Sequence, residues 1–206
     1  MPRYVDPEAR RRHVVDALFR VAARDGLQRA SLRNVADEAQ LNIGSVRHYF
    51  AGQQELMNFA MRSMLDRLAG RLTARVEEAG DLSRHPHAEQ RRIAAGLLGE
   101  LLPLDDRRRA EVTVFIDFVT AARTNPALAG LSREAAHGER DLLRRVLIRL
   151  AANGALRPGL DHDLEAERLA ALLDGLSLSA VLHPDLVTPD TCARAVTAHL
   201  EALAPD

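Results

Sequence analysis

The fold is decided by residues 31–50, which read SLRNVADEAQLNIGSVRHYF. Ser31 and Asn42 are residue types that cap helix N-termini, so this stretch predicts two short helices with a tight turn between them. The apolar positions that would hold the two helices together are Leu32, Val35, Ala36, Ala39, Leu41 and Val46. Because two of these residues are alanines at the point of contact, the helices can approach closely. The spacing is that of a helix-turn-helix.

Helical signals continue along the rest of the chain. Asp6 followed by Pro7 forms a cap and a proline at the first helical position, which predicts a helix over 7–25. An apolar stripe without a breaker predicts a helix over 52–79, about 40 Å long. Further helices are expected at 88–102, 105–124, 126–153, 162–183 and 189–203, with Pro or Gly at their boundaries.

These segments predict an all-α protein of about nine helices. We expect an N-terminal three-helix, homeodomain-like helix-turn-helix domain over 1–52. A C-terminal helical bundle over 53–206 would follow, and the helix over 52–79 would link the two. Only 3% of the residues are aromatic, which argues against an all-β protein because strands favour aromatic side chains.

Composition also limits the cellular setting. Residues 1–12 are charged and lack the apolar stretch of a secretory signal, and no run of 18 uncharged apolar residues is present to span a membrane. A single cysteine, Cys192, excludes an internal disulfide framework and a zinc site built from cysteines. We therefore expect a cytoplasmic protein without a membrane partner.

Charge is distributed unevenly between the two ends. Residues 1–50 carry nine Arg against six acidic residues, a net charge of +3, whereas residues 51–206 carry nineteen Arg against twenty-three acidic residues, a net charge of −4. A basic head on an acidic body is typical of a head that meets a polyanion, although sampling alone can also produce such a difference. Arg10, Arg11 and Arg12 would lie beside the flanking DNA backbone or form a solvated face.

The second helix of the pair would lie in the major groove of DNA and present its N-terminal residues to base edges. Arg47 can grip guanine or phosphate, and Gly44 lets backbone come close to DNA. We expect Phe50 to be a core residue and Tyr49 to be partly one. The predicted DNA-contacting residues are Ser31, Arg33, Asn42, Ile43, Gly44, Ser45, Arg47, His48 and Tyr49.

This same stretch, followed by Glu55-Leu56, resembles the DNA-binding signature of the TetR family of bacterial transcriptional repressors. The resemblance covers about the first 65 residues, and the remainder is similar only in the number and order of helices. Three positions depart from the family pattern. Gln40 replaces the usual turn glycine, Arg47 replaces a tyrosine of the recognition helix, and Gln53 replaces a lysine that holds phosphate, so Gln53 would make a weaker, neutral contact.

The resemblance implies a repressor that acts as a homodimer on a palindromic double-stranded DNA operator and is released by a small-molecule ligand, with no cofactor. A TetR-like activator, or a helical DNA-binding protein without a ligand, is the alternative. Two apolar-striped helices near the C-terminus could form a four-helix dimer interface, or could pack within one chain. The predicted interface residues are Leu142, Leu143, Val146, Leu147, Leu150, Leu169, Leu172, Leu173, Leu176 and Ala180.

The helix over 105–124 is apolar almost all round, apart from one polar stripe. Such a stripe faces either water or an internal cavity, and flexible methionines suit an adaptable cavity. The residues predicted to line a ligand pocket are Met61, Met64, Leu68, Thr113, Phe115, Asp117, Phe118 and Asp174. The alternatives are a solvent-facing stripe and ordinary core methionines, and Asp174 could instead make a hydrogen bond at an interface.

An enzyme is not expected. The eight histidines are scattered, and none forms the spacing of a zinc site. The sequence has no Gly-rich phosphate loop and no nucleophile elbow. Cys192 lacks an evident histidine base, so we predict no catalytic and no metal site.

Overall fold

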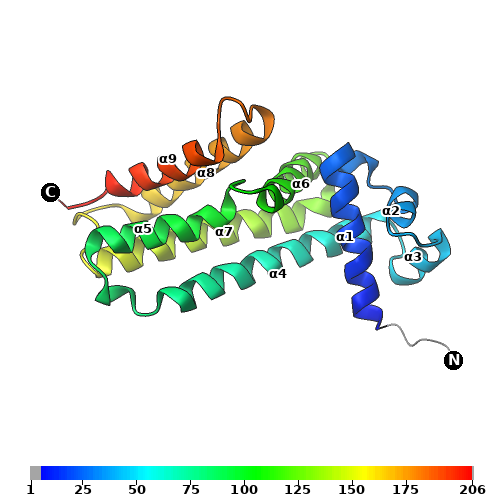
Figure 1. Cartoon of the computed structure of the whole chain (residues 1–206), viewed down its shortest axis with the longest axis horizontal. Helices are drawn as coiled ribbons and strands as arrows, with labels where there is room; N and C mark the ends of the chain where they lie inside the picture. The colour runs from blue at the N-terminus through cyan, green and yellow to red at the C-terminus, as the bar shows by residue number, and fades with distance from the viewer. Residues whose placement is uncertain (1–5, 206) are drawn as a thin grey trace. The chain divides into compact units, whose positions relative to one another are not determined.

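The computed structural model describes residues 6–205, and within them it contains nine α-helices and three short 3-10 helices (Figure 1). The α-helices are α1 (Pro7–Asp25), α2 (Leu32–Glu38), α3 (Ile43–Tyr49), α4 (Gln53–Ala79), α5 (His87–Leu98), α6 (Asp106–Ala122), α7 (Pro126–Ala152), α8 (His162–Leu182) and α9 (Pro189–Glu201). The 3-10 helices are η1 (Leu27–Arg29), η2 (Leu82–Arg84) and η3 (Gly99–Leu101). The predicted all-helical fold is confirmed.

The chain divides into two compact units. Unit 1 contains residues 1–66 and 113–132, and unit 2 contains residues 67–112 and 133–206. This division differs from the expected boundary between 52 and 53. The start of α4 and the second half of α6 join unit 1 because Met61, Met64 and Phe118 are buried in the same hydrophobic core as α1.

Unit 1 is built around α1, which packs against α2 and α3. Its helices begin at the residues that the capping signals predict. The Ser31 hydroxyl accepts a hydrogen bond from the Asn34 amide at 3.2 Å, and the Asn42 side chain accepts one from the Ser45 amide at 2.7 Å. Such caps satisfy amides that have no partner within the helix, and each typically contributes about 1 kcal/mol.

The turn between α2 and α3 contains Gln40 in a left-handed conformation, with φ of 55°. The Leu41 amide donates to the Ala36 carbonyl at 2.9 Å, and the Gln40 amide donates to the Asp37 carbonyl at 3.0 Å. These two bonds form a Schellman motif, whose left-handed position is usually glycine. A side chain there costs about 1–2 kcal/mol, so this turn stores strain.

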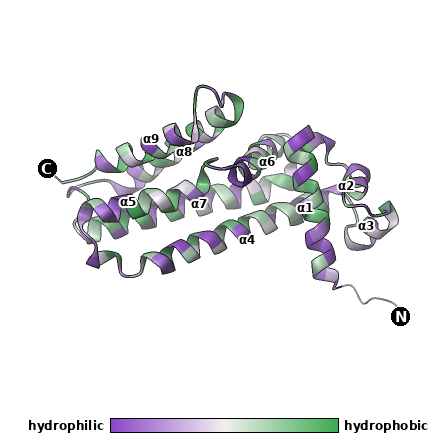
Figure 2. Ribbon diagram, viewed as in Figure 1, coloured by the Kyte–Doolittle hydropathy of each residue, from purple (hydrophilic) through white to green (hydrophobic). Residues whose placement is uncertain are grey.

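Unit 2 has an aliphatic core in which α5 packs against α9, and α9 against α8. Figure 2 shows hydrophobic and hydrophilic residues alternating along these helices, as amphipathic packing requires. The structure corrects six predicted dimer residues, because they are at most 2% exposed within the chain and have no surface for a second copy. They are Leu143, Leu147, Leu150, Leu169, Leu173 and Ala180; the other four, Leu142, Val146, Leu172 and Leu176, are half-buried.

A charged cluster lies beside this core. The Glu100 side chain is only 5% exposed and forms ion pairs with Arg71 at 3.0 Å, Arg75 at 3.3 Å, Arg108 at 3.7 Å and Arg107 at 3.9 Å. The carboxylate therefore ties α4 to the start of α6 within unit 2. Across residues 6–205, no helix is both long and apolar enough to cross a membrane.

Candidate DNA-binding site

The recognition helix α3 has one buried and one exposed face. Val46 is fully buried and anchors the helix in the core of unit 1. On the other side Gly44, Arg47 and His48 are exposed, and Ile43 is 37% exposed. The exposed face therefore combines a cation, an imidazole and an apolar group, which are groups that can read base edges in a major groove.

The start of α3 is shaped by its cap. The Asn42 carboxamide oxygen accepts a hydrogen bond from the Ser45 amide, so this oxygen serves to cap the helix. Ser45 itself is half-buried. A Cβ placed on Gly44 would lie 3.2 Å from that same oxygen. Glycine at 44 thus leaves the Asn42 cap undisturbed. Because it has no side chain, it also lets the backbone at the start of α3 approach DNA closely.

Predicted phosphate contacts come from two other helix starts. Arg33 is exposed in the first turn of α2, and Ser31 is half-buried because its hydroxyl caps that helix. Gln53 is exposed as the first residue of α4. The structure thus leaves Arg33 and Gln53 accessible to a phosphate, whereas Ser31 already accepts a hydrogen bond within the chain.

The end of α3 merges into the core. Phe50 is fully buried, as predicted, and Tyr49 is half-buried against the core of unit 1. The Tyr49 ring also meets the exposed His48 ring edge-on, with 5.1 Å between centroids. His48 is therefore the more accessible of these two rings.

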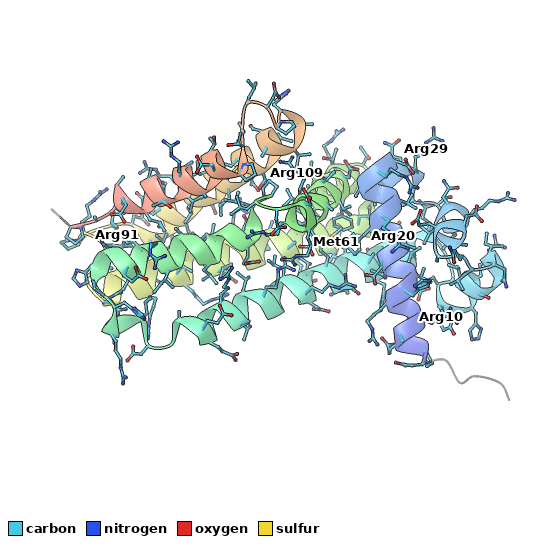
Figure 3. All side chains as sticks on the ribbon, in the orientation of Figure 1. Arg10, Arg20, Arg29, Met61, Arg91 and Arg109 are labelled. Carbon is cyan, nitrogen blue, oxygen red and sulfur yellow. The ribbon has the colours of Figure 1, made fainter. Side chains whose placement is uncertain are left out.

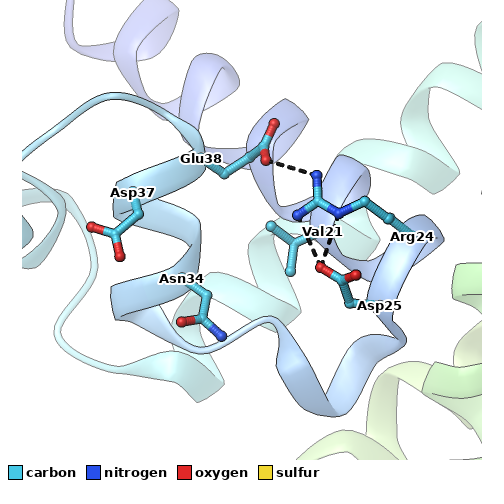
Figure 4. A pocket seen from close by; sticks show the side chains of 6 residues that line it. All are labelled: Val21, Arg24, Asp25, Asn34, Asp37 and Glu38. Atoms are coloured by element: carbon cyan, nitrogen blue, oxygen red, sulfur yellow. Dashed lines mark hydrogen bonds and ion pairs between the residues drawn. The ribbon is translucent and has the colours of Figure 1, made fainter.

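A shallow hollow between α1 and α2 differs in charge from this face (Figure 4). Asp25, Asp37 and Glu38 line it together with a single cation, Arg24. Hydrogen bonds from Arg20 and Arg24 lower the pKa of Glu38, which favours its charged form. With Arg20 counted, three carboxylates face two guanidiniums, so the hollow keeps a net negative charge and is unsuited to the DNA backbone.

The N-terminal arginines behave differently from one another. Arg10 and Arg20 project from α1 and Arg29 from η1 (Figure 3). Arg12 is 58% exposed and pairs with Asp6 at 3.6 Å. Arg11 instead turns toward the end of α3, where it donates to the Tyr49 carbonyl. No signal in the sequence distinguishes Arg11 from its two neighbours, because its partners lie some 40 residues further along the chain.

The residues predicted to line a ligand pocket are divided between the units. Met61, Met64 and Phe118 are buried core residues of unit 1, the alternative that the sequence left open. The Asp117 carboxylate accepts a hydrogen bond from the Leu27 amide at 3.0 Å, just after the end of α1. Thr113 and Phe115 are half-buried in unit 1; in unit 2, Leu68 is half-buried and Asp174 is exposed.

Comparisons with known proteins agree on one family. Residues 89–205 match the model of the BetI-type transcriptional repressor C-terminal domain. The chain is 32% identical to the HTH-type transcriptional regulator PksA of Bacillus subtilis, covering 98% of this chain and 94% of that protein. It is 28% identical to the regulator BetI of Vibrio vulnificus, covering 98% and 96% respectively.

Solved structures share the fold. A transcriptional regulator from Rhodococcus is 34% identical and superposes with a TM-score of 0.77, covering 97% of this chain and 96% of that one. A regulator from Saccharomonospora viridis, solved in complex with choline, is 19% identical with a TM-score of 0.82 and covers 97% and 99%. At that identity the second likeness concerns the fold alone.

The fold and the exposed recognition helix define a helix-turn-helix DNA-binding regulator. The chain belongs to the TetR family of transcriptional regulators and carries a C-terminal domain of the BetI repressor type. It is accordingly a ligand-responsive, DNA-binding repressor, and its family consists of regulators rather than enzymes.

Proposed function

We propose that the protein acts in the cytoplasm as a homodimer, binds a palindromic operator through α3 and leaves it when a small-molecule effector binds. The observation that carries this proposal is the exposed face of α3, where Arg47 and His48 stand beside Ile43 while Val46 fixes the helix from behind. In this proposal Arg47 reads a base, Arg33 and Gln53 hold phosphates, and Asn42 and Gly44 set how closely the helix approaches DNA.

The support for a dimer comes from the outer face of α8. Leu164, Leu178 and Leu182 are 57%, 45% and 60% exposed, and Ala171 is exposed between them. The spacing of seven, seven and four residues places all four on one face of the helix. A self-complementary apolar stripe of this kind suits a two-fold interface, which would set two α3 helices about 34–36 Å apart.

The distribution of aromatic residues bears on the effector. All seven Phe and Tyr residues lie in residues 4–59 and 115–118, so the ranges that form unit 2 contain none. Quaternary ammonium ligands are typically held in cages of aromatic rings. Unit 2 therefore supplies no aromatic cage of its own, and the aromatic residues predicted to line a ligand pocket, Phe115 and Phe118, belong to unit 1.

The test is a gel-shift assay with the duplex upstream of the protein's own gene, against excess random duplex. We expect a retarded complex that resists the competitor, and light scattering should give the mass of a dimer. If the protein preferred neither the upstream duplex nor any selected duplex over random DNA, the proposal that it binds an operator would be overturned. The proposed dimer would be overturned if light scattering gave the mass of a monomer at micromolar concentration for both the wild type and Leu178→Asp.

The alternatives give different results in the same assays. A ligand that binds the folded state raises the melting temperature. A DNA-binding protein without an effector would therefore show no rise in melting temperature with any compound of a thermal-shift library, and no compound would change its affinity for DNA. An activator would bind the same duplex but raise transcription in a reconstituted assay. A repressor lowers it.

A further inference from the structure

Arg11 contacts the recognition helix from α1. Its Nη2 donates to the carbonyl of Tyr49 at 3.2 Å and to Oε1 of Glu55 at 3.4 Å. The Tyr49 carbonyl lies at the C-terminal end of α3, where carbonyl groups lack partners within the helix. A guanidinium at this end satisfies that acceptor and complements the negative end of the helix dipole.

The same guanidinium lies over two rings. Its central carbon lies 5.2 Å from the centroid of Phe50 and 4.8 Å from that of Phe59, within cation–π range. The two rings themselves are 5.5 Å apart with an interplanar angle of 58°. Phe50 follows α3 directly and Phe59 belongs to α4, so the cation joins the elements on both sides of the connection.

Glu55 closes this arrangement. Its Oε2 accepts a hydrogen bond from the Ala51 amide at 2.7 Å, while its other oxygen meets Arg11. The Glu55 carboxylate thus holds the backbone of the short segment between α3 and α4, and the Arg11 guanidinium binds both this carboxylate and the end of α3. These contacts come from three helices that all belong to unit 1.

We propose that Arg11 is a positioning residue that fixes the orientation of α3 relative to α4 and thereby sets operator affinity without touching DNA. A helix of seven residues is marginal without tertiary support, so its orientation depends on contacts such as these. The inference rests on the proposed function, because it assumes that α3 reads an operator.

The geometry separates this role from a phosphate contact. The Arg11 side chain is 29% exposed, and Nη2 already serves two oxygens within the protein. A lysine at this position would keep the charge but lose the planar guanidinium that lies over two rings. Arg11→Lys and Arg11→Met therefore test whether the planar group or the charge matters.

The experiment uses a duplex that the wild-type protein selects from a randomised library, together with a scrambled duplex of equal length. Binding of wild type, Arg11→Lys, Arg11→Met and Phe59→Leu is measured by fluorescence anisotropy at several salt concentrations, well below each melting temperature. Arg92→Met is the matched control, since Arg92 is 71% exposed and pairs with Glu89 in unit 2.

We expect both Arg11 variants to lose about tenfold or more in affinity for the selected duplex and less than about threefold for the scrambled one, at an unchanged salt slope, because no phosphate contact is removed. Combining Arg11→Met with Phe59→Leu should cost less than the product of the two losses. The control should match wild type.

Three results would overturn the inference. Rescue by Arg11→Lys would show that a positive charge alone suffices and would overturn the role of the planar guanidinium. A salt slope lowered by about one unit, with equal losses on both duplexes, would make Arg11 a charge contact to phosphate. A lower melting temperature with unchanged affinities would leave only a packing role. If the wild type selects no duplex, the proposed function itself fails, which is a separate outcome.

Discussion

The two units of the molecule are stabilised by different chemistry. In unit 1, short helices are fixed by capping side chains, small alanines and aromatic rings, with Arg11 reaching across to α3 and α4. In unit 2, long helices bury an aliphatic core, and a nearly buried carboxylate, Glu100, gathers four guanidiniums beside it. A DNA-reading face needs fixed side-chain geometry, whereas an aliphatic core tolerates substitution as long as volume is kept.

The uneven distribution of aromatic residues allows unit 1 to be followed by its own spectroscopic signal. Tyr49 is half-buried in unit 1, the ranges that form unit 2 contain no tyrosine, and the chain has no tryptophan. Tyrosine fluorescence therefore reports on unit 1, while far-ultraviolet circular dichroism reports on every helix. Changes made in one unit can be followed separately from their effect on the other.

The largest expected effect is in unit 2. Glu100→Ala removes the carboxylate that Arg71 and Arg108 share; these arginines are 21% and 16% exposed, and they keep Glu111 and Asp105 as ion-pair partners. Breaking a buried ion pair by removing one partner typically costs about 3–5 kcal/mol, and the remaining carboxylates together with the partial exposure of the arginines favour the lower value. Urea unfolding followed by circular dichroism measures the loss.

Glu89→Gln is the matched control, because Glu89 pairs with the exposed Arg92 and such surface pairs contribute less than about 1 kcal/mol. A loss for Glu100→Ala no larger than that of the control would mean that the cluster is a solvated surface network. The contrast between the units would then rest on aromatic content alone.

The next effect is a pH dependence in unit 2. Partial burial, and then the nearby Asp174, raise the pKa of Glu139 to about 7, with Glu167 adding to the shift and Arg140 opposing it. The folded state therefore favours the protonated carboxyl. The contribution of Glu139 to the free energy of unfolding is complete below the usual pKa of 4.5 and is lost as the pH rises through about 7. This loss is at most about 3 kcal/mol.

We expect Glu139→Gln to stabilise the protein at pH 8 and to leave it unchanged at pH 4, as measured by urea unfolding. The comparison with wild type at each pH is needed because burial lowers the pKa of His199, which acts in the opposite direction at acidic pH. Glu78→Gln, at an exposed position, serves as control. Parallel pH profiles for wild type and Glu139→Gln would contradict the prediction.

In unit 1 the effect falls on DNA binding rather than on stability. Arg47→Ala removes the exposed cation of α3, and a base contact of this kind discriminates by about 1–3 kcal/mol. We expect a loss on the selected duplex of about tenfold or more, a smaller loss on random duplex and an unchanged unfolding midpoint. Anisotropy titrations measure both affinities, and equal losses on the two duplexes would refute a base-reading role.

The units also differ in how much of them the sequence predicts. The start of α1 at Pro7 and the caps at Ser31 and Asn42 follow from signals a few residues long, so they were predicted at the observed positions. Contacts such as the Asp117 carboxylate on the Leu27 amide join residues 90 positions apart. Local patterns contain no information on such pairs, and the carboxylate was assigned to a ligand pocket instead.

The dimer residues illustrate a second limit. On α8 one stripe of leucines, including Leu169 and Leu173, is buried in the chain, while another, including Leu178 and Leu182, is exposed. Both stripes have helical spacing, so periodicity alone does not tell which of them faces the chain's own core. Only the packing of α8 against the remainder of unit 2 resolves this choice.

The smallest expected effect concerns the strained turn of unit 1. Gln40→Gly removes the side chain from a residue with φ of 55°, which relieves about 1–2 kcal/mol, but glycine also loses more backbone entropy on folding. The net gain should be roughly 0.5–1 kcal/mol. Tyrosine fluorescence during thermal unfolding should show the shift, and Gln40→Ala should show none because it keeps the Cβ. If Gln40→Gly destabilises unit 1 instead, the exposed glutamine side chain makes contacts that outweigh the backbone strain, and the turn would then be held by side-chain packing, as unit 2 is.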